Sequence, residues 1–144
     1  MAYEIGQKRV KDTKEYNDHA LGLTLPIRRG NSGMFEQNFT TIDQAKSNIK
    51  NLLKTRKGER VMHPNFGSGL HEILFEQLDD DQIEDKIIST IEDALAMWIP
   101  YVTLGEVEID FSNSNIDRNI VDVSMTFTVG TDIETNVVTF TIEG

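Results

Sequence analysis

The chain has 144 residues, of which 38% are hydrophobic and none is cysteine, so it fits one domain without disulfides or thiolate metal sites. Its net charge is -10, and residues 67–144 hold two Lys or Arg against seventeen Asp or Glu, which argues against a nucleic-acid partner because phosphates would be repelled. No apolar run approaches a membrane span and the N-terminus lacks the apolar core of a signal peptide, so we expect a soluble protein, folded in a cytoplasm, with no membrane partner.

Residues 1–40 are interrupted by glycines and a proline, and they carry no strong periodicity. Residues 8–16 could form a short charged helix, and the alternation over residues 21–27 favours a brief extended segment. We interpret this region as an irregular N-terminal arm that lies on another surface. Terminal disorder is the alternative.

The first clear helix is expected from Thr41. Thr41 and Gln44 have the spacing of a capping box, in which each side chain satisfies a free backbone donor of the other residue. The helix should end by Lys57, with Gly58 in the left-handed position beyond it. One helical face carries the apolar residues Ile42, Ala45, Ile49, Leu52 and Leu53.

The stretch from Lys54 to Glu76 concentrates three glycines and a proline: Gly58, Pro64, Gly67 and Gly69. It has no standard catalytic spacing. We expect a rigid, bent unit that joins the helix end, a turn and a new helical turn, with apolar side chains available for burial.

A second helix is expected over residues 82–98. Asp79 to Asp81 complement its positive N-terminal end, and Asp81 with Glu84 forms another possible capping box. Pro100 stops the helix and favours extended geometry at Ile99. The apolar stripe of this helix consists of Ile83, Ile87, Ile88, Ile91, Ala94, Leu95 and Trp98.

The hydrophobic period changes to two after residue 105, which predicts strands near residues 106–111, 121–129 and 137–142. Short strands with hairpin-length connections should pair antiparallel. We therefore predict an α+β fold, with two main helices packed on a C-terminal antiparallel β-meander.

The last strand has no lysine, proline or bulge signal in its interior, although an exposed sheet edge usually carries one. Either another strand or a partner should cover it, and alternation alone does not give the strand order. The acidic outward residues of this half would favour a basic partner segment, or they only keep the surface solvated: Glu106, Glu108, Asp110 and Asp122.

The residues give little support for a catalytic or metal-binding function. A glycosidase needs two carboxylates across a cleft, whereas Glu72 and Glu76 share one helical face and Glu59 should be solvated. His63 and His71 lack a third metal ligand in a recognisable pattern. Gly67-Ser68-Gly69 matches neither a phosphate loop nor a nucleophile elbow. We predict no catalytic, cofactor or metal site.

Three segments resemble the signature of a known family: Thr-Arg-Lys-Gly-Glu-Arg at residues 55–60, Pro-Asn-Phe-Gly-Ser-Gly-Leu at 64–70, and Leu-Phe-Glu at 74–76. The family is the baseplate wedge family of contractile phage tails, also labelled tail lysozyme-like, whose type VI secretion member is called TssE. The resemblance covers about residues 40–142. It marks as structural signature Arg56, Gly58, Arg60, Pro64, Phe66, Gly67, Gly69 and Leu70.

This resemblance implies a structural virion protein and not an enzyme. Six copies are expected per baseplate, bound to larger wedge proteins and assembled in the bacterial host cytoplasm. The tail sheath protein is expected to add strands to the C-terminal sheet, which initiates the sheath. The alternatives are a peptidoglycan-cleaving tail lysozyme and a general adaptor domain. Phage and phage-derived injection machines are not distinguished.

The resemblance also implies two partner surfaces. The family often has Glu-Pro-Arg after the second helix, where this chain has Ile99-Pro100-Tyr101, so both charges are missing and the contact would be apolar and aromatic. The expected domains are an arm at 1–40 and the wedge domain at 41–144. The expected interface residues are Trp98, Pro100 and Tyr101 at the helix exit and Val138, Thr139 and Phe140 on the last strand. For Trp98, the alternative is that its ring only closes the core.

Overall fold

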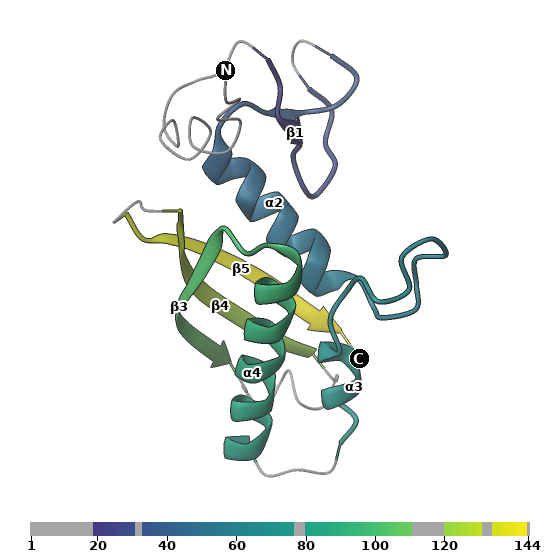
Figure 1. Ribbon diagram of the computed structural model, residues 1–144, viewed down its shortest axis with the longest axis vertical. Helices are drawn as coiled ribbons and strands as arrows, with labels where there is room; N and C mark the ends of the chain where they lie inside the picture. The colour runs from purple at the N-terminus through teal and green to yellow at the C-terminus, as the bar shows by residue number, and fades with distance from the viewer. Residues whose placement is uncertain (1–18, 31–32, 77–79, 111–119, 131–133, 144) are drawn as a thin grey trace, which may run out of the picture.

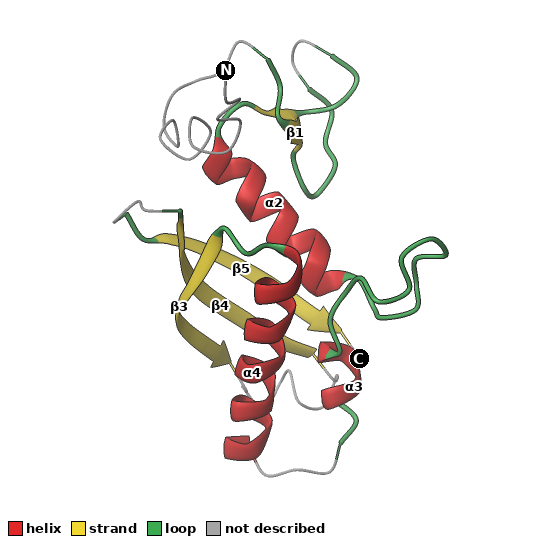
Figure 2. Ribbon diagram, viewed as in Figure 1, coloured by secondary structure: helices red, strands yellow, loops and turns green. Residues whose placement is uncertain are grey.

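The computed structural model describes residues 19–30, 33–76, 80–110, 120–130 and 134–143. A C-terminal sheet forms one layer, and two long helices pack against it, while a small hairpin lies at the N-terminal end of the first of these helices (Figures 1 and 2). The predicted α+β class, with two main helices on an antiparallel meander, is confirmed.

The N-terminal hairpin consists of β1 (Gly22–Leu23) and β2 (Gln37–Asn38), paired antiparallel. The buried Asn38 amide links it to the first long helix: its Nδ2 lies 2.9 Å from Ser47 Oγ and 3.1 Å from Leu23 O. The described part of residues 1–40 therefore contacts the chain's own helix. The division into arm and domain stays a prediction, and the possible helix at 8–16 lies outside the described residues.

Helix α2 spans Thr41–Lys54, and the predicted cap is wrong by one residue. Thr40 is the N-cap: its Oγ1 accepts from Asp43 N at 3.2 Å and donates to Asp43 Oδ2 at 2.6 Å. Thr40 keeps the extended backbone that an N-cap requires, whereas Thr41 is already helical. Thr40 and Thr41 each precede a polar side chain by three residues, Asp43 and Gln44, so the sequence alone does not show which threonine is the cap.

Two further helices follow, α3 (Leu70–Ile73) and α4 (Asp80–Trp98). The short α3 is the new helical turn that was predicted within the stretch from Lys54 to Glu76. Because α4 already begins at Asp80, Asp81 lies inside it and the predicted cap at that residue is wrong. The helix ends before Pro100, as predicted.

The sheet contains β3 (Val102–Asp110), β4 (Ile120–Val129) and β5 (Asn136–Glu143), in the order β3-β4-β5. β3 begins four residues earlier than predicted. The β4–β5 ladder is regular along all eight residues of β5. The β3–β4 ladder contains a bulge, because Gly105 and Glu106 together lie opposite Thr126.

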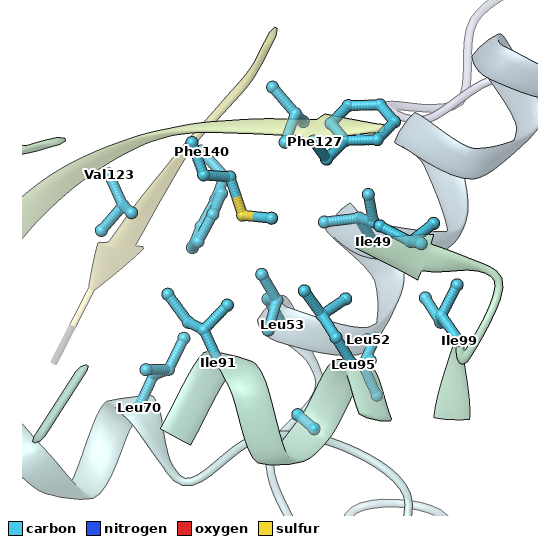
Figure 3. Close-up of a cluster of buried hydrophobic side chains, with 14 of the residues drawn as sticks. Ile49, Leu52, Leu53, Leu70, Ile91, Leu95, Ile99, Val123, Phe127 and Phe140 are labelled. Atoms are coloured by element: carbon cyan, nitrogen blue, oxygen red, sulfur yellow. The ribbon is translucent and has the colours of Figure 1, made fainter. Parts of the chain in front are cut away.

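The core lies between one face of the sheet and the two long helices, with α2 beside β5 and α4 beside β3. Side chains from both helices and from the sheet converge there (Figure 3). The alternation predicted for the last two strands is confirmed, since every second residue is buried: Val121, Val123, Met125, Phe127, Val129, Val138, Phe140 and Ile142.

Candidate partner-binding site

The family-like stretch forms a closed loop, residues 55–68, that projects from the body of the molecule (Figure 1). We call it the signature loop. At its base Ser68 N donates to Thr55 O at 2.9 Å, and Ser68 Oγ donates to Leu53 O at 2.7 Å. Gly67 has φ +122°, and a Cβ there would lie 2.4 Å from Thr55 O, so only glycine fits.

The turn inside the signature loop is closed by the chain's own backbone. Gly58 has φ +85° and donates from its N to Pro64 O at 2.7 Å, while Arg56 N donates to Glu59 Oε2 at 3.0 Å. The left-handed Gly58 is confirmed. Its expected place directly after the helix is wrong, because α2 ends at Lys54 with an extended Thr55 as C-cap.

An aromatic stack ties the signature loop to both long helices. Arg60 lies with its guanidinium carbon 3.8 Å from the centre of the Phe66 ring, and its Nη2 donates to Asn51 Oδ1 at 3.2 Å. The Phe66 and Trp98 rings meet edge to face, with centroids 5.2 Å apart. Leu70, just after the loop, is fully buried. These signature residues therefore position the loop on α2 and α4.

The tip of the signature loop carries Val61 and Met62, whose side chains are 94% and 84% exposed. Sequence reasoning did not single out this pair. The available signal was two adjacent apolar residues inside a turn-rich, charged segment, which by itself is common on protein surfaces.

At the helix exit, the predicted interface residues Trp98, Pro100 and Tyr101 differ in environment from one another and from their neighbour Ile99. Ile99 is 4% exposed and belongs to the core, so its side chain offers nothing to a partner. Pro100 is exposed, and Tyr101 is 40% exposed with its hydroxyl accepting from Asn48 Nδ2 at 2.9 Å. Trp98 is half-buried against Phe66.

Trp98 also lines a cleft of about 520 Å³ between the signature loop and α4. The loop contributes Lys57 and Asn65, and α4 contributes Asp93 and Met97. The cleft therefore combines an aromatic wall with both signs of charge. Of the residues predicted at the helix exit, Trp98 lines this cleft.

The predicted interface residues of the last strand lie on opposite faces of the sheet. Val138 and Phe140 are 3% and 6% exposed and point into the core, whereas Thr139 is exposed. A partner strand at this edge would therefore bond to the backbone groups of β5 that point away from β4, and Thr139 is the predicted residue whose side chain remains exposed. Strand β5 ends the three-stranded sheet, and no strand of the described residues pairs with its outer side.

A groove of about 390 Å³ lies along β5. Thr139 to Thr141 form one wall, and the C-terminal half of α2 contributes Lys50 and Lys54 to the other, with Leu25 and Pro26 at the side. An open backbone edge and an adjacent groove thus coincide.

The opposite edge strand differs from β5. Along β3, the bulge at Gly105 and Glu106 interrupts the ladder, and Glu106 N donates to Thr126 Oγ1 at 2.7 Å. The acidic residues Glu106, Glu108 and Asp110 lie on this strand and are exposed. The charge that we expected to select a basic segment therefore lies mainly along the β3 side of the sheet, away from β5.

The carboxylates considered for catalysis are all exposed: Glu59, Glu72 and Glu76. Glu59 accepts a backbone hydrogen bond within its turn, and Glu76 is paired with Lys86. None has the apolar surroundings that keep a general acid protonated. In the described ranges, no three His, Asp or Glu side chains gather to hold a metal ion, and no helix is long and apolar enough to cross a bilayer.

Comparison with known proteins gives a family and a fold. The family model described as "Baseplate wedge protein gp25" matches residues 41–143. A protein from Geobacter sulfurreducens described as a candidate tail lysozyme is 23% identical over 73% of this chain and 94% of its own, with a TM-score of 0.58. A chain of the anti-feeding prophage baseplate is 20% identical over 78% of this chain and 86% of its own, with a TM-score of 0.61. Among curated proteins, none matches this chain.

Proposed function

The chain belongs to the baseplate wedge protein gp25 family, and on that premise we propose that it is a baseplate subunit that starts the tail sheath by accepting a strand at the edge of β5. Family membership makes it a structural component of a contractile tail or tail-like baseplate. The strand acceptance, the sheath protein as donor and a copy number of six are the proposed parts.

The observation that carries the proposal is the contrast between the two edges of the sheet. An exposed edge presents unpaired backbone donors and acceptors that can pair with another chain. β3 has a bulge that interrupts such pairing, whereas β5 is regular along its whole length and has no lysine or proline in its interior. β5 is therefore the edge suited to an added strand.

A second, separate contact is proposed with the larger wedge proteins at the helix exit. Pro100 and Tyr101 are exposed, and Trp98, which precedes them at the end of α4, lines the cleft. Aromatic side chains with a polar tip are common anchors in protein interfaces. The family's charged residues are absent here, so this contact would rest on apolar area and on the Tyr101 hydroxyl.

Site-specific cross-linking tests the sheath contact, because a cysteine-free chain accepts a single introduced thiol. Thr139→Cys places it on the β5 edge strand, and Thr103→Cys is the matched control, an exposed threonine on the β3 edge strand. The introduced thiol of each protein is labelled with a short photo-activatable cross-linker, which bonds to any neighbouring chain on irradiation. Both labelled proteins are then assembled with baseplate and sheath components and irradiated.

We expect a sheath adduct from Thr139→Cys and none from Thr103→Cys. A sheath adduct from Thr103→Cys alone, or equal adducts from both positions, would contradict the assignment of β5. Assembled sheath without an adduct at either position would place the sheath contact elsewhere. Thermal melts of both variants verify that the fold is preserved.

A further inference from the structure

The groove beside β5 has an unusual charge for this protein. The chain carries a net charge of -10, yet the residues that line the groove include two lysines, Lys50 and Lys54, and no Asp or Glu. Neither ammonium makes a salt bridge within the described residues, although Lys50 is half-buried. The groove is a local positive site on an acidic protein.

Helix stability explains only one of these lysines. Lys54 lies in the last turn of α2, where a cation favours the helix dipole. Lys50 lies one turn earlier, and like charges four residues apart on a helix repel each other. Lys46 extends the same row one further turn back but does not line the groove. The pair in the groove is therefore not accounted for by the folding of α2.

The geometry gives these lysines a role when a strand is added. Alternate side chains of a strand point to opposite faces of a sheet, and those of β5 that face α2 are buried, as with Phe140. A strand beside β5 would direct its own alternate side chains to the same face, where Lys50 and Lys54 border the groove. α2 and β5 run in a similar direction across the molecule (Figure 1).

The distance between the two lysines along α2 also matches the distance between alternate residues of a strand. Four residues of an α-helix rise about 6 Å, and two residues of a strand rise about 6.7 Å. Side chains at positions i and i+2 of the added strand can therefore each approach one lysine.

We infer that the strand accepted by β5 is acidic on its α2-facing side, with Asp or Glu at two alternate positions that pair with Lys50 and Lys54. This inference rests on the proposed function and adds the chemistry of the partner. It is the opposite of the basic segment expected from the sequence, because the acidic residues behind that expectation lie mainly along β3. The two ion pairs would fix the register of the strand, and its backbone would supply most of the binding.

Binding of synthetic strand peptides to the full chain tests the inference. Three peptides of equal length carry Thr and Val on one side and differ at two alternate positions on the other, where they have Glu, Gln or Lys. Binding is measured at low and high salt by fluorescence anisotropy, and amide chemical shifts show whether β5 is the site. The protein variants are Lys50→Gln with Lys54→Gln, and Lys46→Gln as the control from the same helical row.

We expect the Glu peptide to bind roughly tenfold more tightly than the Gln peptide at low salt and the Lys peptide to bind most weakly, since two partly exposed ion pairs contribute modestly. The preference should disappear in the double variant, remain in Lys46→Gln and weaken with salt.

The outcomes separate the two proposals. Equal binding of the Glu and Gln peptides at β5, or a preference that survives in the double variant, overturns the acidic-strand inference and leaves strand addition intact. If no peptide shifts the β5 amides at millimolar concentration, strand addition at this edge fails, and the inference fails with it.

Discussion

The backbone hydrogen-bonding groups at the base of the signature loop and at the edge of β5 find their partners in different ways. At the loop base the chain supplies its own partners, through Ser68 to Thr55 and Leu53 and through the close approach of Gly67. At β5 one side of the strand is paired and the other has no strand beside it in the described structure. The stretch that is most recognisable in sequence therefore specifies the fold, while the edge proposed to bind a partner has an ordinary sequence.

The largest stability effect is expected from Gly67→Val. The substitution forces a β-branched side chain into φ +122° and against the Thr55 carbonyl, so it should lower the free energy of unfolding by roughly 3 kcal/mol or more. Gly58→Val has the strained φ of +85° but open space, and we expect about 1–2 kcal/mol.

Gly69→Ala is the matched control, because its Cβ would meet nothing within 4 Å and its φ is -90°. Chemical denaturation of the Gly67, Gly58 and Gly69 variants measures the three changes in the free energy of unfolding. Equal losses at Gly67 and Gly69 would show that the close approach at the loop base does not stabilise the fold.

A smaller loss is expected from Ser68→Ala. The Ser68 side chain is 2% exposed and donates to the Leu53 carbonyl near the end of α2, so its removal leaves a buried acceptor unpaired. We expect a loss of about 1–2 kcal/mol. Denaturant midpoints give the value, and a loss below about 0.3 kcal/mol would mean that the hydroxyl is replaced by another donor.

The β3 edge resembles the loop base, because a backbone amide in its bulge is hydrogen-bonded to another residue of the same chain. We therefore expect the loss of this bond to reduce stability. Thr126→Val removes the hydroxyl that accepts from Glu106 N at 2.7 Å and should cost about 1 kcal/mol. Amide exchange at Glu106 should become faster. Thr128→Val, on the same strand and the same face, should change neither quantity, and equal effects at both threonines would remove the special role of the bulge.

The smallest stability effect is expected from the double substitution Lys50→Gln and Lys54→Gln. The lost helix-dipole contact of Lys54 and the relieved repulsion between the lysines act in opposite directions, so stability should stay within about 0.5 kcal/mol of the unmodified chain. A melt with a clear loss would indicate that the lysines stabilise the free protein and are not reserved for a partner.

Periodicity predicted most of the fold. The apolar stripes of α2 and α4 and the alternation of β4 and β5 depend on burial, which the sequence encodes directly. The cap of α2 was misplaced because the adjacent threonines Thr40 and Thr41 both offer a hydroxyl three residues before a polar side chain. The bulge at Gly105 and the network of Asn38 depend on contacts between residues that are distant in the chain, so no local pattern could predict them.

The candidate site was only partly predictable. Thr139 was correctly placed as an exposed residue on a strand, but which strand is at the edge follows from topology and not from alternation. The charge of the partner was inferred from acidic residues near in sequence, whereas Lys50 and Lys54 reach the groove from a helix about ninety residues earlier. Ile99 was expected near a partner, and the tight turn after α4 directs it into the core instead.

Hydrogen exchange of this subunit, free and within an assembled baseplate with its sheath, tests the role of β5 most directly. In the free protein, the alternate β5 amides on the open side should exchange quickly, and the Ser68 amide at the loop base should be protected. On assembly we predict that these β5 amides gain strong protection while the Ser68 amide changes little. Unchanged exchange along β5 in the assembled particle would contradict strand addition at this edge.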